Sequence, residues 1–199
     1  DMEGVMKTYN DFVSAGNPVD EATITQLLSA FKISEDRKHL DFLQSEVNRN
    51  NCFTPQIFHK LIWLSEKLQE HEYTENFIKQ MKAHGFSVDV EVFTAIIVNA
   101  HLNNDFERAN SAFNNMKKLE IKPTGRIYSC LITQFGKMNK IESSFGLFEE
   151  MKREGIQPDR IVYTSMINTC GRSKQLENAF NLLEEMKECN QLPDIITYT

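Results

Sequence analysis

The sequence predicts an all-α fold, an α-solenoid of helix-turn-helix repeats with a 35-residue period. Three observations support this prediction. The chain is similar to itself at a fixed step of 35 residues, and each step contains two short stretches with apolar residues at helical spacing. No stretch alternates convincingly between apolar and polar residues, as a half-buried strand would. A single helical hairpin cannot bury its apolar stripe alone, so neighbouring hairpins must stack and leave a groove.

The repeat is clearest between Gly125 and Asp194, where two consecutive segments align at the 35-residue step. A methionine ladder continues the same step over most of the chain, and helical spacing indicates that it belongs to the core. The aligned pairs are Tyr128 with Tyr163, Gly136 with Gly171, Glu142 with Glu177, Ser144 with Ala179, Pro158 with Pro193, and Asp159 with Asp194. The ladder is Met81, Met116, Met151 and Met186.

Taken in order, the chain divides into five whole repeats with a partial repeat at each end, and the regularity rises towards the C-terminus. The ranges are 1–20 (second half of a repeat), 21–54 (a degenerate repeat one residue short), 55–89, 90–124, 125–159 and 160–194 (repeats), and 195–199 (the start of a further repeat). The chain opens at Asp1 without an initiator methionine and stops just after a repeat begins. We therefore expect it to be a piece of a longer protein.

Each repeat contains two short amphipathic helices. In repeat 125–159 we expect Gly136 to end the first helix, and Gly155 with Pro158 to close the repeat. The apolar positions are Ile127, Leu131, Ile132 and Phe135 in the first helix, and Ile141, Phe145, Phe148 and Met151 in the second.

The start of the second helix carries a possible capping signal. Asn139 with Glu142, and Asn104 with Glu107, have the three-residue spacing of a capping box. The spacing predicts that both asparagines cap the second helix of their repeats.

Composition bounds the function classes. The 199 residues are 41% hydrophobic and 25% charged, which is typical of an ordered domain, and no apolar run approaches the roughly 18 residues of a membrane span. The net charge of -6, taken whole, argues against nucleic-acid binding, although its distribution reverses part of that argument. The four cysteines include no CxxC pair, which indicates reduced, mostly buried thiols.

The repeat resembles the pentatricopeptide repeat (PPR) family. The resemblance rests on the period, on the aromatic near the start of each repeat, on the late "EEMK", and on the closing "PD". It is strong over residues 90–199 and weaker over 1–89. The tetratricopeptide repeat has a 34-residue period and a Trp-Leu-Gly-Tyr signature, and Trp63 stands outside any such pattern. The resemblance implies a right-handed solenoid that binds single-stranded RNA, with about one base read by each repeat.

In that family the deciding pair is the residue after the aromatic of the first helix together with the last residue of the repeat. Carried onto this chain, the pairs are Thr25 with Thr54, His59 with Asp89, Thr94 with Thr124, Ser129 with Asp159, and Thr164 with Asp194, while Thr199 starts a further pair. The resemblance implies guanine opposite Thr164 and Ser129, a purine opposite Thr94, and RNA running parallel to the chain. Thr, Ser and Asp beside a helix start are also ordinary capping residues, so a purely structural role stays open.

The charge distribution favours RNA in the C-terminal repeats. Residues 125–140 and 160–175 contain basic residues and no acid, whereas the acid excess lies in the second helices. In the family, the position shared by Lys67, Lys137 and Arg172 often contacts phosphate, although solvated side chains in a turn are the alternative. Earlier repeats contain more acid in their first helices, including Glu91, where the family usually packs an aliphatic residue against the base. The N-terminal repeats are therefore doubtful as an RNA surface.

No catalytic, metal or cofactor motif is recognisable. The five histidines do not pair with cysteines or carboxylates at metal-ligand spacing, and His71-Glu72 lacks the H-x-E and PCxxC pattern of a zinc deaminase. No phosphate-binding glycine loop or nucleophile elbow is present. We therefore expect a binding module rather than an enzyme, with no cofactor.

The resemblance implies a mitochondrial or plastid protein that acts in RNA processing, stability, editing or translation. Two alternatives remain open. The acid-rich N-terminal repeats are compatible with an interaction scaffold for protein partners in a ribosomal or RNA-processing assembly. The chain is also compatible with the RNA-targeting arm of an enzyme whose catalytic domain lies outside it.

Overall fold

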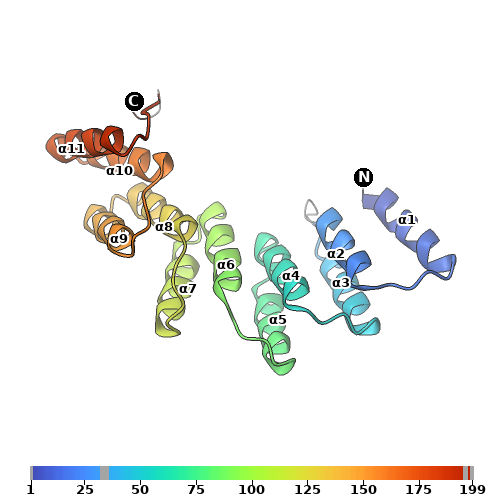
Figure 1. The fold of residues 1–199 in the computed structure, drawn as a ribbon. Helices are drawn as coiled ribbons and strands as arrows, with labels where there is room; N and C mark the ends of the chain where they lie inside the picture. Colours follow the sequence, from blue (N-terminus) through green and yellow to red (C-terminus); the bar gives the residue numbers. More distant parts are fainter. Residues whose placement is uncertain (1, 32–35, 195–196, 198–199) are drawn as a thin grey trace. The chain divides into compact units, whose positions relative to one another are not determined.

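The computed structural model describes residues 2–31, 36–194 and 197, and these contain eleven α-helices and no strand (Figure 1). The all-α prediction is therefore confirmed. The helices are α1 Met2–Ser14, α2 Glu21–Ala30, α3 Lys38–Arg49, α4 Pro55–Lys67, α5 His71–Ala83, α6 Val90–Leu102, α7 Phe106–Lys118, α8 Gly125–Lys137, α9 Ile141–Arg153, α10 Arg160–Arg172 and α11 Leu176–Glu188.

The chain forms two compact units, an N-terminal unit of Asp1–Asn99 and a C-terminal unit of Ala100–Thr199. Within the C-terminal unit, α8 packs on α9 and α10 packs on α11, and the two first helices, α8 and α10, also pack side by side. The same arrangement recurs in the N-terminal unit, where α4 packs on α5 and beside α2. First helices thus line one side of each stack and second helices the other.

The core consists of the apolar stripes that the periodicity predicts. In repeat 125–159 the aromatic Tyr128 and its apolar neighbours on α8 are buried, as are Phe148 and Met151 of α9. All four residues of the methionine ladder are buried, so the prediction that they are core residues is confirmed. Burying such side chains is the main favourable term in packing one hairpin on the next.

The helices end differently from the sequence prediction. Gly136 lies inside α8, which continues to Lys137, so the prediction that this glycine ends the helix is wrong. A Cβ built on Gly136 would lie 2.3 Å from Oγ1 of Thr169 on α10. The glycine therefore allows the two first helices to approach each other closely, a long-range requirement that the local pattern does not reveal.

The helix ends instead use residues with left-handed backbone. Asn104 and Asn139 both have a φ of 57°, and they follow the first helix rather than cap the second. The N-cap of α7 is Asp105, and the N-cap of α9 is Lys140, which makes no side-chain capping bond. The capping-box prediction is therefore wrong at both positions. The residues with positive φ fall at two series close to the repeat period, namely Gln69, Asn104, Asn139 and Lys174, and Gly16, Asn51, Gly85, Glu120, Gly155 and Asn190.

Except at Gly16, where the side chain of Asn17 rather than its backbone N–H donates to the carbonyl of Phe12, each of these turns has the hydrogen bonds of a Schellman motif. After α9, the N–H of Gly155 donates to the carbonyl of Lys152 at 3.0 Å, and the N–H of Ile156 donates to that of Met151 at 3.1 Å. The left-handed residue between helix and turn thereby satisfies carbonyls that would otherwise lack partners. Glycine adopts this conformation without strain, whereas in other residues the Cβ crowds the backbone and destabilises it.

Glu120→Gly should stabilise the fold by about 0.5–1 kcal/mol, because exposed Glu120 holds the left-handed conformation that glycine adopts freely. Gly155→Ala should destabilise it by about 1 kcal/mol for the converse reason. Gly146→Ala is the matched control, because Gly146 is helical, its Cβ would meet nothing within 4 Å, and alanine should stabilise there. Urea unfolding of the three variants measures the effect, and equal signs for Gly155→Ala and Gly146→Ala would contradict it.

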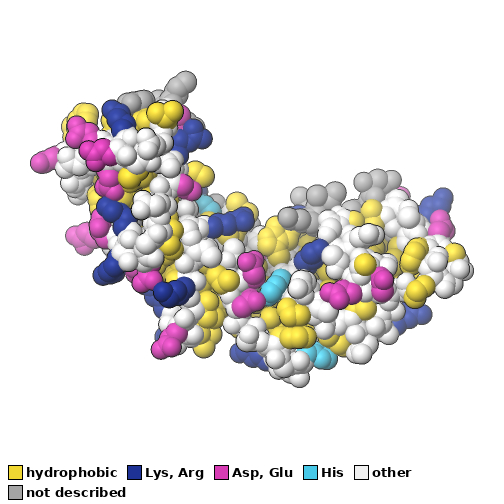
Figure 2. All heavy atoms as spheres, in the orientation of Figure 1, with side chains coloured by type: hydrophobic (Ala, Val, Ile, Leu, Met, Phe, Trp, Pro, Cys, Tyr) yellow, Lys and Arg dark blue, Asp and Glu magenta, His cyan; other side chains and the backbone are white. Residues whose placement is uncertain are grey.

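A polar network recurs between consecutive second helices of the C-terminal unit. Nζ of Lys152 lies 2.9 Å from Oε1 of Glu185, which also accepts a hydrogen bond from the hydroxyl of Tyr163 at 3.0 Å. One repeat earlier, Lys117 contacts Glu150 at 2.7 Å, and Glu150 accepts from Tyr128. Figure 2 shows acidic and basic side chains interleaved over the end of the molecule that holds α9 and α11. Burial and the neighbouring carboxylate raise the pKa of Tyr128, so its hydroxyl remains a donor.

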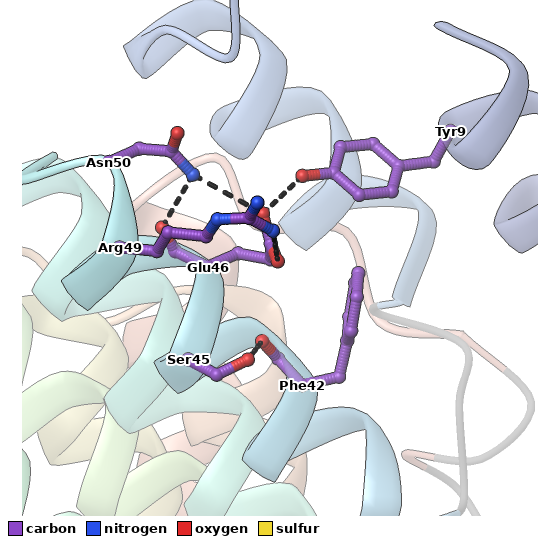
Figure 3. A network of polar contacts seen from close by, with 6 residues as sticks. All are labelled: Tyr9, Phe42, Ser45, Glu46, Arg49 and Asn50. Atoms are coloured by element: carbon purple, nitrogen blue, oxygen red, sulfur yellow. Dashed lines mark hydrogen bonds and ion pairs between the residues drawn. The ribbon is translucent and has the colours of Figure 1, made fainter. Parts of the chain in front are cut away.

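The N-terminal unit contains a similar contact between a tyrosine and a glutamate, but the two residues are 37 rather than 22 positions apart in the chain. The hydroxyl of Tyr9 on α1 points at the carboxylate of Glu46 on α3, which Asn50 and Arg49 also contact (Figure 3). Glu46 is buried, and burial together with this carboxylate raises the pKa of Tyr9. The contact joins the first helix of the chain to α3 and satisfies a carboxylate that would be costly to bury alone.

Candidate nucleic-acid interface

Two neighbouring hollows lie on the first-helix side of the C-terminal unit. The first has a volume of about 420 Å³ and lies between α8 and α10. It brings together Thr164 and Asp194, predicted to read a base, and Lys137 and Arg172, predicted to contact phosphate. Its other lining residues are Thr133, Arg160, Ile161, Ser165 and Asn168.

The second hollow, of about 440 Å³, contains the preceding predicted pair, Ser129 and Asp159. Arg126 supplies a positive charge there, and Ile161 lines both hollows with 63% of its surface exposed. An exposed apolar side chain shared by two neighbouring hollows is a surface that an unstacked base can pack against. Residues at equivalent positions of consecutive repeats therefore line the two hollows.

The pair in the first hollow is already engaged in local contacts. Oδ1 of Asp194 accepts hydrogen bonds from the N–H and the hydroxyl of Thr197, at 3.1 and 3.0 Å. Oδ2 of Asp194 lies 3.4 Å from Nη1 of Arg160. The hydroxyl oxygens of Thr164 and Thr197 are 3.0 Å apart. In the second hollow, Ser129 donates to the carbonyl of Gly125 at 2.9 Å.

The alternative reading of these residues as helix caps also has support. Oδ1 of Asp159 accepts from the N–H of Val162 at 2.9 Å, and Oδ1 of Asp89 accepts from those of Glu91 and Val92. Thr54 caps α4 through the N–H of Ile57. Thr124 precedes α8 without a side-chain capping bond. A capping carboxylate keeps a second oxygen, so capping and base contact are compatible.

In the N-terminal unit, the side chains of Thr54, His59 and Asp89 already make contacts within the protein. Nε2 of His59 lies 3.0 Å from Oδ1 of Asp89, and the hydroxyl of Thr54 donates to Glu21 at 2.9 Å. The carbonyl of Thr25 accepts from Nζ of Lys60 at 3.2 Å. Lys67 lies in the last turn of α4, half-buried.

The remaining predicted base-reading residues are Thr94, its partner Thr124, and Thr199. Thr94 lies on α6 in the N-terminal unit, where its hydroxyl donates to the carbonyl of Val90 at 2.8 Å. Its expected partner, Thr124, belongs to the C-terminal unit. Thr199 lies outside the described residues.

The two cations of the first hollow, Lys137 and Arg172, lie in different surroundings. Nη2 of Arg172 donates to the carbonyl of Gly136 at 2.9 Å, so this side chain bridges α10 to the end of α8. Lys137 is exposed in the last turn of α8. Burial, followed by the charge of Lys137, lowers the pKa of His101, which lines the second hollow. The neutral imidazole is therefore favoured at this position.

Sequence reasoning missed one residue of the first hollow's polar network, Thr197. A signal was present, because the residues one, two and three periods earlier are the buried aliphatics Val162, Ile127 and Val92. A hydroxyl where the repeat otherwise buries an aliphatic side chain calls for a polar partner.

No cluster of three or more potential metal-ligating side chains occurs within residues 2–31, 36–194 and 197. The same residues contain no helix long and apolar enough to cross a membrane.

Comparisons with known proteins identify related sequences and folds. The model described as "PPR repeat family" matches residues 126–172 and 159–199, and that described as "Pentatricopeptide repeat domain" matches residues 76–138. No curated protein sequence matches the chain.

Three solved structures illustrate the fold similarity. The PPR protein PPR10 from maize has a TM-score of 0.74 at 16% identity, covering 99% of this chain and 28% of that one. PPR10 in complex with an 18-nt psaJ RNA element gives 0.73 at 17% identity, covering 98% of this chain. The PPR domain of Arabidopsis thaliana protein-only RNase P 1 in complex with tRNA gives 0.71 at 17% identity, covering 89% of this chain and 94% of that one. The chain thus spans 28% of the length of the PPR10 structures.

Proposed function

Since the chain belongs to the pentatricopeptide repeat family, we propose that it binds single-stranded RNA along the first helices of its C-terminal unit, with about one base per repeat. The observation that supports this best is the first hollow. It places a hydroxyl and a carboxylate, Thr164 and Asp194, beside two cations, Lys137 and Arg172. The first two groups can engage a base edge, and the cations can engage the phosphates on either side.

The second hollow extends the same binding path by one repeat. Ser129 and Asp159 repeat the hydroxyl and carboxylate, and exposed Ile161 between the hollows can pack against a base. We propose guanine at both positions, with the RNA running parallel to the chain. From the resemblance to the family, we propose a mitochondrial or plastid protein with a role in RNA processing, stability or translation.

The N-terminal unit is proposed to contribute less to RNA binding. The contacts of His59 with Asp89, and of Thr54 with Glu21, occupy groups that a base would need. Exposed Glu91 adds negative charge on α6, which repels phosphate. A protein partner for this unit is therefore the second candidate function.

The chain itself is proposed to act as a binding module without catalytic activity. A third possibility is that it targets an enzyme to its RNA, by analogy with the PPR domain of the protein-only RNase P.

Asp194→Asn should move the base preference of repeat 160–194 from guanine towards adenine, by about tenfold in relative affinity. A carboxamide both donates and accepts, as the adenine edge requires, whereas a carboxylate only accepts. Anisotropy with short single-stranded RNAs that differ only opposite this repeat measures the change.

Two features make this experiment discriminating. Asparagine caps a helix about as well as aspartate, so a purely capping Asp194 would leave the base preference unchanged. The matched control is Asp105→Asn, where the side chain caps α7 by accepting from the N–H of Arg108 at 3.0 Å, away from both hollows. No binding of any RNA at low salt would refute the proposed function for this chain.

A further inference from the structure

Thr197 carries a buried hydroxyl next to the first hollow. Only 4% of its surface is exposed, and it occupies the place of the aliphatic Val162 one period earlier. A buried hydroxyl must be hydrogen-bonded, and the bonds it makes fix the hydrogens of its neighbours.

Counting donors and acceptors assigns the hydroxyl hydrogens of Thr164 and Thr197. The hydroxyl of Thr197 donates to Oδ1 of Asp194, because an ionised carboxylate can only accept. Thr197 has one hydroxyl hydrogen, so in its 3.0 Å contact with Thr164 it is the acceptor and Thr164 is the donor. Thr197 also accepts from the backbone N–H of Asp194 at 3.2 Å, which completes its bonds.

This assignment determines what the first hollow offers to a ligand. The hydrogen of Thr164 points to Thr197, so its oxygen is left as an acceptor. Oδ2 of Asp194 is a second acceptor, and Nη1 of Arg160, 3.4 Å away and on a side chain lining the same hollow, is a donor. Arg160, Thr164 and Asp194 together therefore present one donor and two acceptors.

The Watson–Crick edge of guanine is the complement of that set, with one acceptor (O6) followed by two donors (N1–H and N2–H). Uracil presents acceptor, donor, acceptor, so it fails at the third group, and adenine fails at the first two. Mismatched polar groups are penalised because each loses its hydrogen bonds to water without replacement.

We infer that Arg160 is a third base-contacting residue of this repeat, donating to O6 of guanine. We further infer that Thr197 is a positioning residue that keeps Thr164 and Asp194 as acceptors. This inference rests on the proposed RNA binding. The preceding repeat lacks both side chains. Gly125 occupies the position equivalent to Arg160, and Val162 occupies the position equivalent to Thr197. Repeat 160–194 should therefore discriminate among bases more sharply than repeat 125–159.

The test uses the 199-residue chain and short single-stranded RNAs with guanine, inosine, uracil or adenine opposite repeat 160–194. Arg160→Ala should weaken binding of guanine, inosine and uracil by about tenfold and leave adenine unchanged, because only the first three present an acceptor beside an N–H. Lys137→Ala, from the same hollow, is the control and should weaken all four RNAs alike, with a shallower salt dependence.

Thr197→Val provides the second measurement. Valine fills the same place one period earlier, so the variant should fold, which its unfolding midpoint verifies. Inosine lacks the N2 amino group, and the preference for guanine over inosine should fall about threefold once Thr164 is free to turn its hydrogen towards the base.

The outcomes separate the inference from the function on which it rests. If the wild type binds RNA but Arg160→Ala weakens the binding of all four RNAs equally, Arg160 is a phosphate contact. That result would overturn its assigned role. An unchanged guanine-to-inosine ratio in Thr197→Val would overturn the positioning role. Absence of RNA binding by the wild type would instead refute the proposed function.

Discussion

Reversing two charges in the groove with Lys137→Glu and Arg172→Glu should lower the affinity for single-stranded RNA by about 100-fold at low salt. Both residues line the first hollow of the C-terminal unit, so the double variant places two carboxylates where phosphates are expected. The slope of log affinity against log salt concentration should become shallower by about 1.4, which corresponds to two lost phosphate contacts on a single strand.

The matched control changes the net charge equally on the opposite side of the same unit. Arg153→Glu and Lys187→Glu alter exposed residues of α9 and α11, outside both hollows. Electrophoretic mobility shift or anisotropy titrations at several salt concentrations compare the two double variants. Equal losses in both would show that net charge, rather than the groove, governs binding. Because Arg172 also bonds to the carbonyl of Gly136, the unfolding midpoint of the groove variant must be checked.

Gly136→Ala should destabilise the C-terminal unit by about 2–3 kcal/mol. The new Cβ would lie 2.3 Å from Oγ1 of Thr169, a distance at which something must move. Thr169 has little freedom to move, because it is buried and donates to the carbonyl of Ser165 at 2.7 Å. The strain would therefore fall on the packing of α8 against α10. Urea or thermal unfolding measures the loss.

Two further variants test this explanation. In Gly136→Ala combined with Thr169→Ala, the clashing oxygen is gone and the remaining Cβ lies 3.6 Å away, so the double variant should recover at least 1 kcal/mol relative to additivity. Gly171→Ala is the control, since its Cβ meets nothing within 4 Å, and it should stabilise α10 by about 0.5–1 kcal/mol. Two glycines at the same repeat position would thus respond with opposite signs. Additive losses in the double variant would contradict the proposed clash.

The sequence predicts the helices and their buried faces well because those depend on local periodicity. The methionine ladder and the residues beside Tyr128 lie in the core, as spacing alone indicates. The same register also brings Thr164 and Asp194 into one hollow, although they are 30 positions apart in the chain.

The failures concern interactions that local patterns do not contain. Gly136 is read as a helix stop because glycine usually is one, whereas its requirement comes from Thr169 on another helix. Asn139 matches a capping box, but its left-handed backbone places it after the first helix. Asparagine is favoured in both settings, so spacing alone cannot separate them. The role of Thr197 depends on a hydroxyl from α10 and is visible only in three dimensions.

The recurring network of the C-terminal unit makes its repeats interchangeable modules. The ion pair of Lys152 with Glu185 repeats that of Lys117 with Glu150. The edge-to-face contact of Phe148 with Tyr163 likewise repeats one period earlier. A tandem duplication of residues 125–159 would therefore arrive with matching charged and aromatic partners on both of its faces. A gene encoding such a chain can lengthen by whole repeats, each addition extending the array without requiring a newly evolved interface.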